Sequence, residues 1–469
     1  MKQRVLCYLT ILVVLVGLLV SCGPAPTVEE PTAPPSAETE APSEETEAPQ
    51  VELTPLEQWA AGIRAEYEGT TLRLAVASHP SIEAFRQMTP DFEALTGITV
   101  IWDEMEEGVL ADKLLIEASA GRSSYDVIMN CPEFTPALVE LGVIEPLDRY
   151  IQDESTSPEW FDYEDILAAY RDMLSYEGQH YGIPFAGETV FLFYRQDLFD
   201  EYDVAVPQTF EELLQTAAFF QGKEEGLSGI SMRTRLGWEC TYMWSVFIFP
   251  FGGYIIDPDS GAAGLNDPGT VASLEYMIDL LEYAPVGVES FSFPEAWDAF
   301  MQGKTAMMVE ASAAAPEVEN PDKSVVAGNV GYAPMPAGPA GAYSGVWGWG
   351  LSITASSENQ DAAWALITYL TSKELQDEYI ANGGIVSRSS ALSDPARQAQ
   401  YPYYQAILDT LEQAAELQEQ GLGVVVMIPE WSQISEIMGA EAARAIAGEI
   451  SAQAAADNMQ VQVEAILPQ

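Results

Sequence analysis

Strand patterns and helix patterns alternate at short spacing in the first third of the chain, and this alternation constrains the fold more than any other feature. Residues 71–77 form a strand pattern, and an amphipathic helix pattern separates them from a second strand over 98–102. A second helix over about 107–120 and a third strand over 125–129 follow. Parallel strands need crossover helices between them, so the alternation predicts an α/β fold with a mainly parallel sheet flanked by helices.

The loops after the first and third predicted strands are candidate site loops. Parallel sheets bind ligands beyond the carboxyl ends of their strands. Residues 78–80 and 130–134 occupy these positions, and they contain His79 and Glu133. We therefore expect both loops to face a ligand.

Three later segments also carry structural signals. Residues 209–212 match a helix capping box, Thr-Phe-Glu-Glu, before an apolar helix. Residues 345–354 are punctuated by glycine and resemble a strand, and an amphipathic helix over about 360–370 follows. The α/β pattern therefore continues beyond the first third.

The composition excludes several classes of function. The 469 residues include 72 acidic and 19 basic residues, a net charge of −53, which would repel a phosphate backbone and excludes nucleic acid as a partner. A hydrophobic fraction of 48% and ten tryptophans indicate a folded globular protein. The chain has only two histidines and no G-x-S-x-G, H-E-x-x-H or P-loop pattern, so we expect no metal ion, no cofactor and no catalytic residue.

The N-terminus has the pattern of a targeting segment. A positively charged start and an apolar segment over 5–20 precede Ser21 and Cys22. This arrangement resembles the lipobox of bacterial lipoproteins, which implies that residues 1–21 are a signal peptide and that Cys22 is acylated; the alternative is an uncleaved anchor helix. Residues 22–55 are rich in proline, threonine and glutamate and predict a disordered acidic stalk.

Six stretches of the body resemble the family 1 extracellular solute-binding proteins of ABC importers, the carbohydrate-binding group. They occur in the order that the family has. The stretches are 141–148 (LGVIEPLD), 181–184 (YGIP), 193–199 (FYRQDLF), 207–213 (PQTFEEL), 300–307 (FMQGKTAM) and 348–353 (GWGLSI).

The resemblance implies a periplasmic-binding-protein-like fold of type II, in which two α/β lobes enclose a cleft. The crossings between the lobes would fall near 185–189 and 345–349, where small residues allow a hinge. The implied domains are a first lobe over 56–185 plus 350–392 and a second lobe over 189–345 plus 395–469.

Three acids are candidate ligand-binding residues, because carboxylates accept hydrogen bonds from sugar hydroxyls. Glu188 lies at the first crossing, where relatives of the maltodextrin type carry a sugar-binding acid; a solvated hinge acid is the alternative. Glu133 matches a second such acid by spacing, and an exposed loop glutamate is the alternative. Glu239 has a counterpart in relatives too, and a surface salt bridge is equally compatible with its position.

Aromatic rings that cover the C–H faces of a sugar form the second group of candidates. Trp347 and Trp349 alternate at the second crossing, so both lie on one face of the strand and at least one should reach the cleft, with core packing as the alternative. Trp431 lies where relatives often present an aromatic ring, and it is a candidate for stacking on the sugar. Trp238 is a weaker candidate and is expected in the core, and His79 is either a ligand-facing or a satisfied loop histidine.

Three features limit these expectations. Relatives of the maltodextrin type carry a stacking tryptophan where this chain has only small residues over 311–315, so maltodextrin itself is not expected. Residues 257–261 predict a hairpin turn; a calcium loop would need later ligands that are missing. Cys131 and Cys240 would lie on opposite lobes, and we expect both to be free thiols.

The sequence predicts a lipid-anchored, monomeric receptor that captures a sugar or polyol and delivers it to the permease of an ABC importer. It would act at the outer face of the bacterial cytoplasmic membrane, with the lipid anchor as its only membrane contact. Two alternatives remain at this point: an extracellular glycosidase, and a polyamine receptor of the same fold. Hydrolysis assays would test the first alternative, and calorimetry with spermidine would test the second.

Overall fold

The computed structural model describes residues 53–120, 123–420 and 422–468 of the chain. The expected signal peptide over 1–21, the acylated Cys22 and the stalk up to residue 52 lie outside the described residues. The first helix, α1 (Pro55–Tyr67), begins where Thr54 and Glu57 form a capping box. None of the helices in the described ranges has the length and apolar character that a membrane span requires.

One eight-stranded sheet, in the order β2-β1-β3-β10-β6-β8-β7 with β9 on β6, runs through the described body. The strands β1, β2 and β3 are parallel to one another, as are β7 and β8, and every antiparallel pair in this sheet involves β6 or β10. The strands are β1 (Thr71–Ala77), β2 (Thr99–Met105), β3 (Val127–Asn130), β4 (Ser175–Tyr176), β5 (Gln179–His180), β6 (Ile183–Arg195), β7 (Ser228–Ser231), β8 (Thr305–Ala311), β9 (Val330–Ala333) and β10 (Val346–Ile353).

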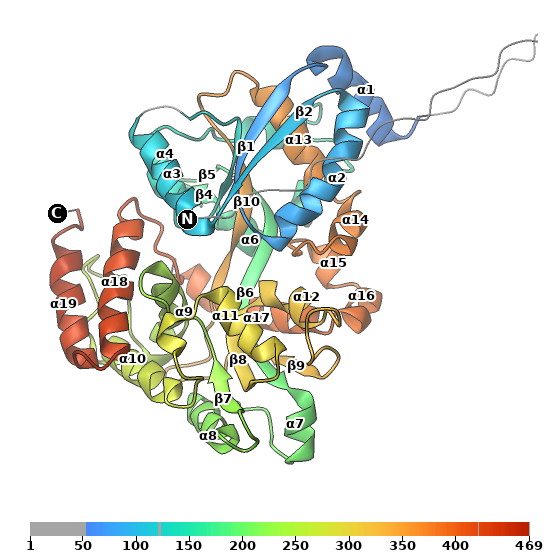
Figure 1. Cartoon of the computed structure of the whole chain (residues 1–469). Coiled ribbons are helices and arrows are strands. Elements are labelled where there is room, and N and C mark those ends of the chain that lie inside the picture. The colour runs from blue at the N-terminus through green and yellow to red at the C-terminus, as the bar shows by residue number, and fades with distance from the viewer. Residues whose placement is uncertain (1–52, 121–122, 421, 469) are drawn as a thin grey trace, which may run out of the picture. The chain divides into compact units, whose positions relative to one another are not determined.

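The long strand β6 connects two groups of strands. Its first half pairs with β10, from Ile183 to Thr189, and its second half pairs with β8 and β9, from Val190 to Arg195. Figure 1 shows β6 and β10 running between the group that contains β1 and the group that contains β8. We call the part built on β1, β2 and β3 the first lobe and the part built on β7, β8 and β9 the second lobe. The predicted two-lobed α/β fold is confirmed.

Helices cover the sheet on both lobes. They are α1 (Pro55–Tyr67), α2 (Pro80–Thr96), α3 (Glu107–Ser119), α4 (Thr135–Glu140), α5 (Asp148–Ile151), α6 (Ala168–Asp172), α7 (Gln196–Glu201), α8 (Phe210–Phe220), α9 (Trp238–Ile248), α10 (Pro268–Leu281), α11 (Phe293–Met301), α12 (Ala315–Val318), α13 (Gln360–Leu370), α14 (Gln376–Ala381), α15 (Ser389–Leu392), α16 (Pro395–Gln400), α17 (Tyr403–Glu419), α18 (Trp431–Ile446) and α19 (Ala452–Glu464).

Local sequence signals place several of these elements correctly. The predicted strand over 71–77 is β1, and the helix expected over about 360–370 is α13. The capping box predicted at 209–212 is present, since Thr209 accepts from the backbone N–H of Glu212 and the Glu212 carboxylate accepts from the backbone N–H of Thr209. These signals are local, so they need no tertiary contact to be read.

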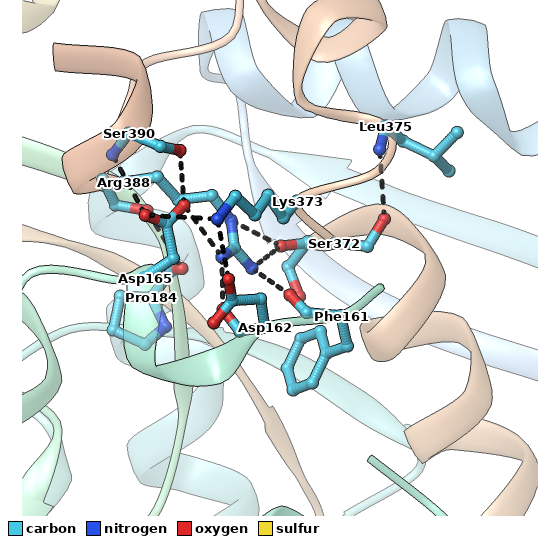
Figure 2. A network of polar contacts seen from close by, with 11 residues as sticks. Phe161, Asp162, Asp165, Pro184, Ser372, Lys373, Leu375, Arg388 and Ser390 are labelled. Atoms are coloured by element: carbon cyan, nitrogen blue, oxygen red, sulfur yellow. Dashed lines mark hydrogen bonds and ion pairs between the residues drawn. The ribbon is translucent and has the colours of Figure 1, made fainter. Parts of the chain in front are cut away.

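A buried arginine connects three segments of the first lobe that are distant in the sequence. Arg388 is 1% exposed and donates to the backbone carbonyls of Phe161, Asp162 and Thr371. Figure 2 shows this guanidinium surrounded by those segments, with Lys373 bonded to Asp162 at 2.7 Å. Burial lowers the pKa of Arg388 to about 10, which still leaves it charged at neutral pH. The network therefore anchors the loop before α6 to the ends of α13 and α15.

Glycine at position 187 in β6 is required by packing. A Cβ atom there would lie 2.2 Å from the ring of Tyr170 on α6. This glycine was expected as part of a hinge, and the structure gives it a second reason, the close approach of an aromatic ring to the crossing strand.

Candidate ligand-binding site

Two adjoining pockets open between the lobes, and they have Glu107 and Trp238 as shared lining residues. The aromatic pocket, with about 450 Å³ of empty space, is lined by Ser78, His79, Pro80, Glu107, Glu188, Arg233, Trp238, Tyr242, Phe293, Trp297, Ala313, Trp347 and Trp349. The acidic pocket, with about 570 Å³, is lined by Glu107, Ala111, Asp112, Leu115, Glu133, Phe134, Trp238, Trp431, Ser432, Ser435 and Glu436.

His79 and Glu188 meet at the floor of the aromatic pocket. His79 caps α2, where its Nδ1 accepts from the backbone N–H of Ser81 at 3.1 Å. That bond leaves the proton on Nε2, which lies 3.2 Å from Oε1 of Glu188. The Glu188 side chain is only 5% exposed, so the histidine orients a nearly buried carboxylate at the crossing strand. His79 is therefore satisfied within the loop, and it also lines the aromatic pocket.

The two tryptophans of β10 form an aromatic wall beside Glu188. Strand alternation places Trp347 and Trp349 on one face, and their rings meet edge to face with centroids 4.8 Å apart. Tyr242 packs against Trp347 at 5.8 Å, also edge to face. The indole Nε1 of Trp347 and the hydroxyl of Tyr242 are buried and have no hydrogen-bond partner. Buried donors without a partner are costly, so this wall is suited to a ligand that accepts hydrogen bonds.

An ion pair that the sequence analysis did not identify lies beside Tyr242, which packs on this wall. Arg233 donates from Nε to the two carboxylate oxygens of Glu310 at 3.1 and 2.9 Å, and its Nη2 bonds to the same carboxylate. The guanidinium also lies 4.6 Å from the centroid of the Tyr242 ring. One signal pointed to the pair: Glu310 is the single acid in the fully buried strand β8, and a buried carboxylate needs a cation or a proton.

The acidic pocket has a different electrostatic character. The described residues that line it include four acids and no lysine, arginine or histidine. Burial raises the pKa of Glu133 to about 7, although the Sγ–H of Cys131, 3.6 Å away, stabilises its ionised form. Burial and the neighbouring acids Glu133 and Glu188 also raise the pKa of Glu107, while Arg233 opposes that shift. The four acids disfavour an anionic ligand, and the raised pKa values of Glu133 and Glu107 reduce this repulsion, because they favour the uncharged carboxylic acid.

Three buried polar atoms of residues that line the acidic pocket have no hydrogen-bond partner. They are Nε1 of Trp431, Oγ of Ser432 and Oγ of Ser435, and all three side chains come from α18. Trp431 is 1% exposed and Ser435 is 3% exposed. Unsatisfied groups at this depth are typical of sites that bind a ligand or water.

The structure brings six of the seven candidate residues to the pockets. Their distribution is His79, Glu188, Trp347 and Trp349 in the aromatic pocket, and Glu133 and Trp431 in the acidic pocket.

Glu239 and Trp238 differ from the rest. Glu239 lines neither pocket; it is 2% exposed and forms an ion pair with Arg235, so the salt bridge expected as its alternative is present, although buried. Trp238 was expected in the core, and this was wrong: it is half-buried and lines both pockets. As the first residue of α9, it projects from a helix end, where a side chain has fewer neighbours than in mid-helix.

The remaining sequence predictions concern the cysteines and residues 257–261. Cys131 and Cys240 are buried free cysteines. Residues 257–261 form the predicted turn, in which the Asp257 carboxylate accepts from the backbone N–H groups of Asp259 and Ser260. Within the described ranges, no three His, Cys, Asp or Glu side chains are grouped so that they could hold a metal ion.

Comparison with known proteins gives consistent matches. The sequence model of the bacterial extracellular solute-binding protein family matches residues 77–377. The erythritol/L-threitol-binding protein of Mycolicibacterium smegmatis is 26% identical over 346 residues, 71% of each chain. The mannitol-binding protein of Pseudomonas aeruginosa is 28% identical over 399 residues, which cover 81% of this chain and 89% of that one.

Solved structures agree with the sequence matches. A solute-binding protein of Agrobacterium radiobacter in complex with ribitol superposes with a TM-score of 0.79 at 28% identity, over 86% of this chain and all of that one. A solute-binding protein of Agrobacterium vitis with bound D-mannitol gives 0.76 at 27% identity, over 85% and 98%. The chain therefore shares both sequence and two-lobed architecture with proteins that bind small solutes.

Proposed function

Because this chain belongs to the bacterial extracellular solute-binding protein family, whose members act outside the cytoplasm, we propose that it binds a neutral sugar or polyol for an ABC importer. The ligand would lie in the aromatic pocket and be released unchanged to a membrane permease. The observation that carries the proposal is the convergence of Glu188, Trp347 and Trp349 on one pocket at the crossing strands.

The chemistry of this pocket matches a polyhydroxylated, uncharged molecule. The Glu188 carboxylate accepts hydrogen bonds from hydroxyls, and the indole rings of Trp347 and Trp349 cover C–H surfaces. Arg233, the single arginine among the described residues that line the pocket, is already neutralised by Glu310, so it offers no free charge to an anion. The acids of the neighbouring pocket disfavour anions further.

Capture would follow from closure of the two lobes about the crossing strands. The domain boundaries inferred above, 56–185 plus 350–392 and 189–345 plus 395–469, would put the change of lobe within β6 and in the first half of β10. A ligand favours the closed form only through its higher affinity for that form. Side chains from both lobes line the aromatic pocket, and this supports such a preference.

The anchor and the partners belong to the same proposal. Acylation of Cys22 would hold the monomeric protein at the outer face of the membrane, and residues 22–55 would give the body reach toward the permease. The energy for import would come from the ATPase of the transporter, and this chain would bind its solute without chemical change.

A thermal-shift and calorimetry panel tests the proposed function. Erythritol, ribitol, mannitol, glucose and maltose are titrated into the purified protein, with spermidine as a cationic alternative. We expect at least one neutral compound to raise the melting temperature and to be recovered intact after incubation. Binding of spermidine alone, or hydrolysis of maltose, would reject the proposal.

A variant assigns the binding to the pocket. Glu188→Gln should weaken the binding of the identified compound by roughly tenfold or more, because a charge-assisted hydrogen bond contributes about 1.5–3 kcal/mol. Glu164→Gln is the matched control, since that side chain is 80% exposed and lines neither pocket. Equal affinity in the two variants would remove Glu188 from the site.

A further inference from the structure

Glu107 and Trp238 line both pockets, and we call this pair of residues the boundary. They are the two residues that both pockets share, and they come from opposite sides of the cleft. Glu107 begins α3 in the first lobe, directly after β2, and Trp238 begins α9 in the second lobe. The boundary is therefore made by one side chain from each lobe.

The backbone around Trp238 is held firmly. Gly237 has a φ of +100°, and a Cβ there would lie 3.1 Å from the carboxylate of Glu436. Gly439 of α18 packs so closely on this turn that a Cβ at 439 would lie 1.9 Å from the carbonyl oxygen of Gly237. Because α18 fixes the start of α9, Trp238 has little freedom to move its backbone away from Glu107.

An ion pair between the lobes lies next to the boundary. Nη2 of Arg235 is 3.8 Å from Oε1 of Glu106, which precedes Glu107 in the chain. The same guanidinium bonds to the buried carboxylate of Glu239, one residue after Trp238. Arg235 therefore lies within ion-pair distance of one acid from each lobe, next to the boundary.

The two pockets differ in what they offer a ligand. The aromatic pocket has Glu188, Arg233 and the indole wall, whereas the acidic pocket has Glu133, Trp431 and the unpartnered Oγ of Ser435. Each pocket offers groups that can hydrogen-bond a hydroxylated unit, and a ligand that reached both pockets would contact Glu107 and Trp238.

We propose that Trp238, together with Glu107, limits ligand length, so that the protein takes an acyclic polyol or a single sugar ring and excludes a disaccharide. This inference rests on the proposed function and names its substrate class. Trp238 acts as a specificity-determining residue: its indole covers the unit bound in the aromatic pocket and closes the way to the acidic pocket. Removing the indole would join the pockets into one groove with aromatic rings at both ends.

Calorimetry with mannitol and maltose tests this inference on the purified wild-type protein and on three variants. The wild type should bind mannitol, or a smaller polyol of the panel, and bind maltose at least about a hundredfold more weakly, since the second ring would clash with the boundary. Trp238→Ala should gain maltose binding by about tenfold or more while losing affinity for the polyol. Trp238→Phe, which keeps an aromatic barrier, should retain most of the discrimination.

Trp297→Ala is the matched control, because Trp297 lines the aromatic pocket but not the boundary. It should weaken polyol binding without any gain for maltose, whereas a mere enlargement of the cleft would raise maltose binding in both alanine variants. Wild-type protein that binds maltose as well as mannitol would overturn the length limit and leave the proposed function standing. A Trp238→Ala protein that still prefers mannitol over maltose as strongly as the wild type would also overturn the length limit and leave the proposed function standing. If no sugar or polyol binds to any variant, the proposed function fails and the length limit fails with it.

Discussion

At the scale of single residues, the cleft is defined by ionisable groups removed from water. A buried ionisable group loses its hydration, and only a partner, a proton or a ligand can compensate that loss. Four side chains are in this position: Glu188, Glu133, Glu310 and Arg233. His79 orients Glu188, Arg233 pairs with Glu310, and Glu133 responds by a raised pKa. The lost hydration is thus compensated in three different ways: by a hydrogen bond at Glu188, by an ion pair at Glu310 and by a shift toward the protonated form at Glu133.

The buried pair of Arg233 and Glu310 gives the first prediction. Glu310→Gln leaves the guanidinium without its counterion and should lower the free energy of unfolding by about 3–5 kcal/mol. Urea denaturation measures this change. Glu68→Gln is the control, since it breaks the exposed pair with Arg64, and it should change stability by less than about 1 kcal/mol. Similar values for both variants would contradict the assignment of Arg233 and Glu310 as a buried pair.

The raised pKa of Glu133 gives the second prediction. Its pKa is about 7 in the folded protein against 4.5 for an ordinary glutamate, so the folded state binds more protons between these values. The contribution of Glu133 to stability should therefore fall as pH rises from about 4.5 to about 7 and then level off, by up to about 3 kcal/mol at 1.36 kcal/mol per pKa unit.

The measurement compares wild-type protein with Glu133→Gln by urea denaturation at several pH values. The variant cannot titrate at this position, so the difference between the two curves isolates Glu133 from the other acids. The wild type should lose stability relative to the variant over this window. Parallel curves would show that Glu133 titrates normally in the folded chain.

At the scale of elements, the crossing strand β6 carries the connection between the lobes and tolerates few changes. It is buried from Ile183 to Tyr194, so its residues must fit neighbours on both faces. Gly187 is the tightest position, because the ring of Tyr170 occupies the space of a side chain.

Two glycine-to-alanine substitutions, which should change the free energy of unfolding in opposite directions, test this packing. Gly187→Ala should lower the free energy of unfolding by about 1–3 kcal/mol or more, the cost of overpacking a filled core. Gly62→Ala makes the same chemical change in α1, where no atom lies within 4 Å of the new methyl group, and it should raise stability by about 0.5–1 kcal/mol. Thermal unfolding of both variants measures the effect, and a stabilised Gly187→Ala protein would contradict the close approach of Tyr170.

At the scale of the whole molecule, the family assignment explains why the chain combines a two-lobed body with an extracytoplasmic location. A receptor that works with a membrane permease gains from being held near it, and the sequence before the body has the pattern of a lipid-anchored leader.

Cys22→Ala tests the anchor. Acylation at Cys22 predicts that wild-type protein stays with membranes and partitions into detergent, whereas the variant should be found mainly in the aqueous phase. The solute-binding body should bind its ligand equally well in both forms, because residue 22 lies outside it. A variant that remains with membranes would favour the alternative of an uncleaved anchor helix.

The sequence alone determined the features that depend on neighbours in the chain. Strand β1, helix α13 and the capping box at Thr209 follow from period and local hydrogen bonding, and the family pattern predicted the two-lobed fold. The family pattern also identified the candidates Glu188, Trp347 and Trp349, because it predicted where the chain crosses between the lobes.

Only the tertiary structure decided how these residues meet. The pairing of Arg233 with Glu310 joins residues 77 positions apart, and the shared boundary of Glu107 and Trp238 joins the two lobes. Burial and the proximity of charges depend on distances in space, which no local sequence pattern contains. The sequence around Trp238 would look the same if this residue were fully buried, and the sequence around Glu239 would look the same if that residue were exposed. The sequence determines which groups are available, and the fold decides which of them are removed from water together.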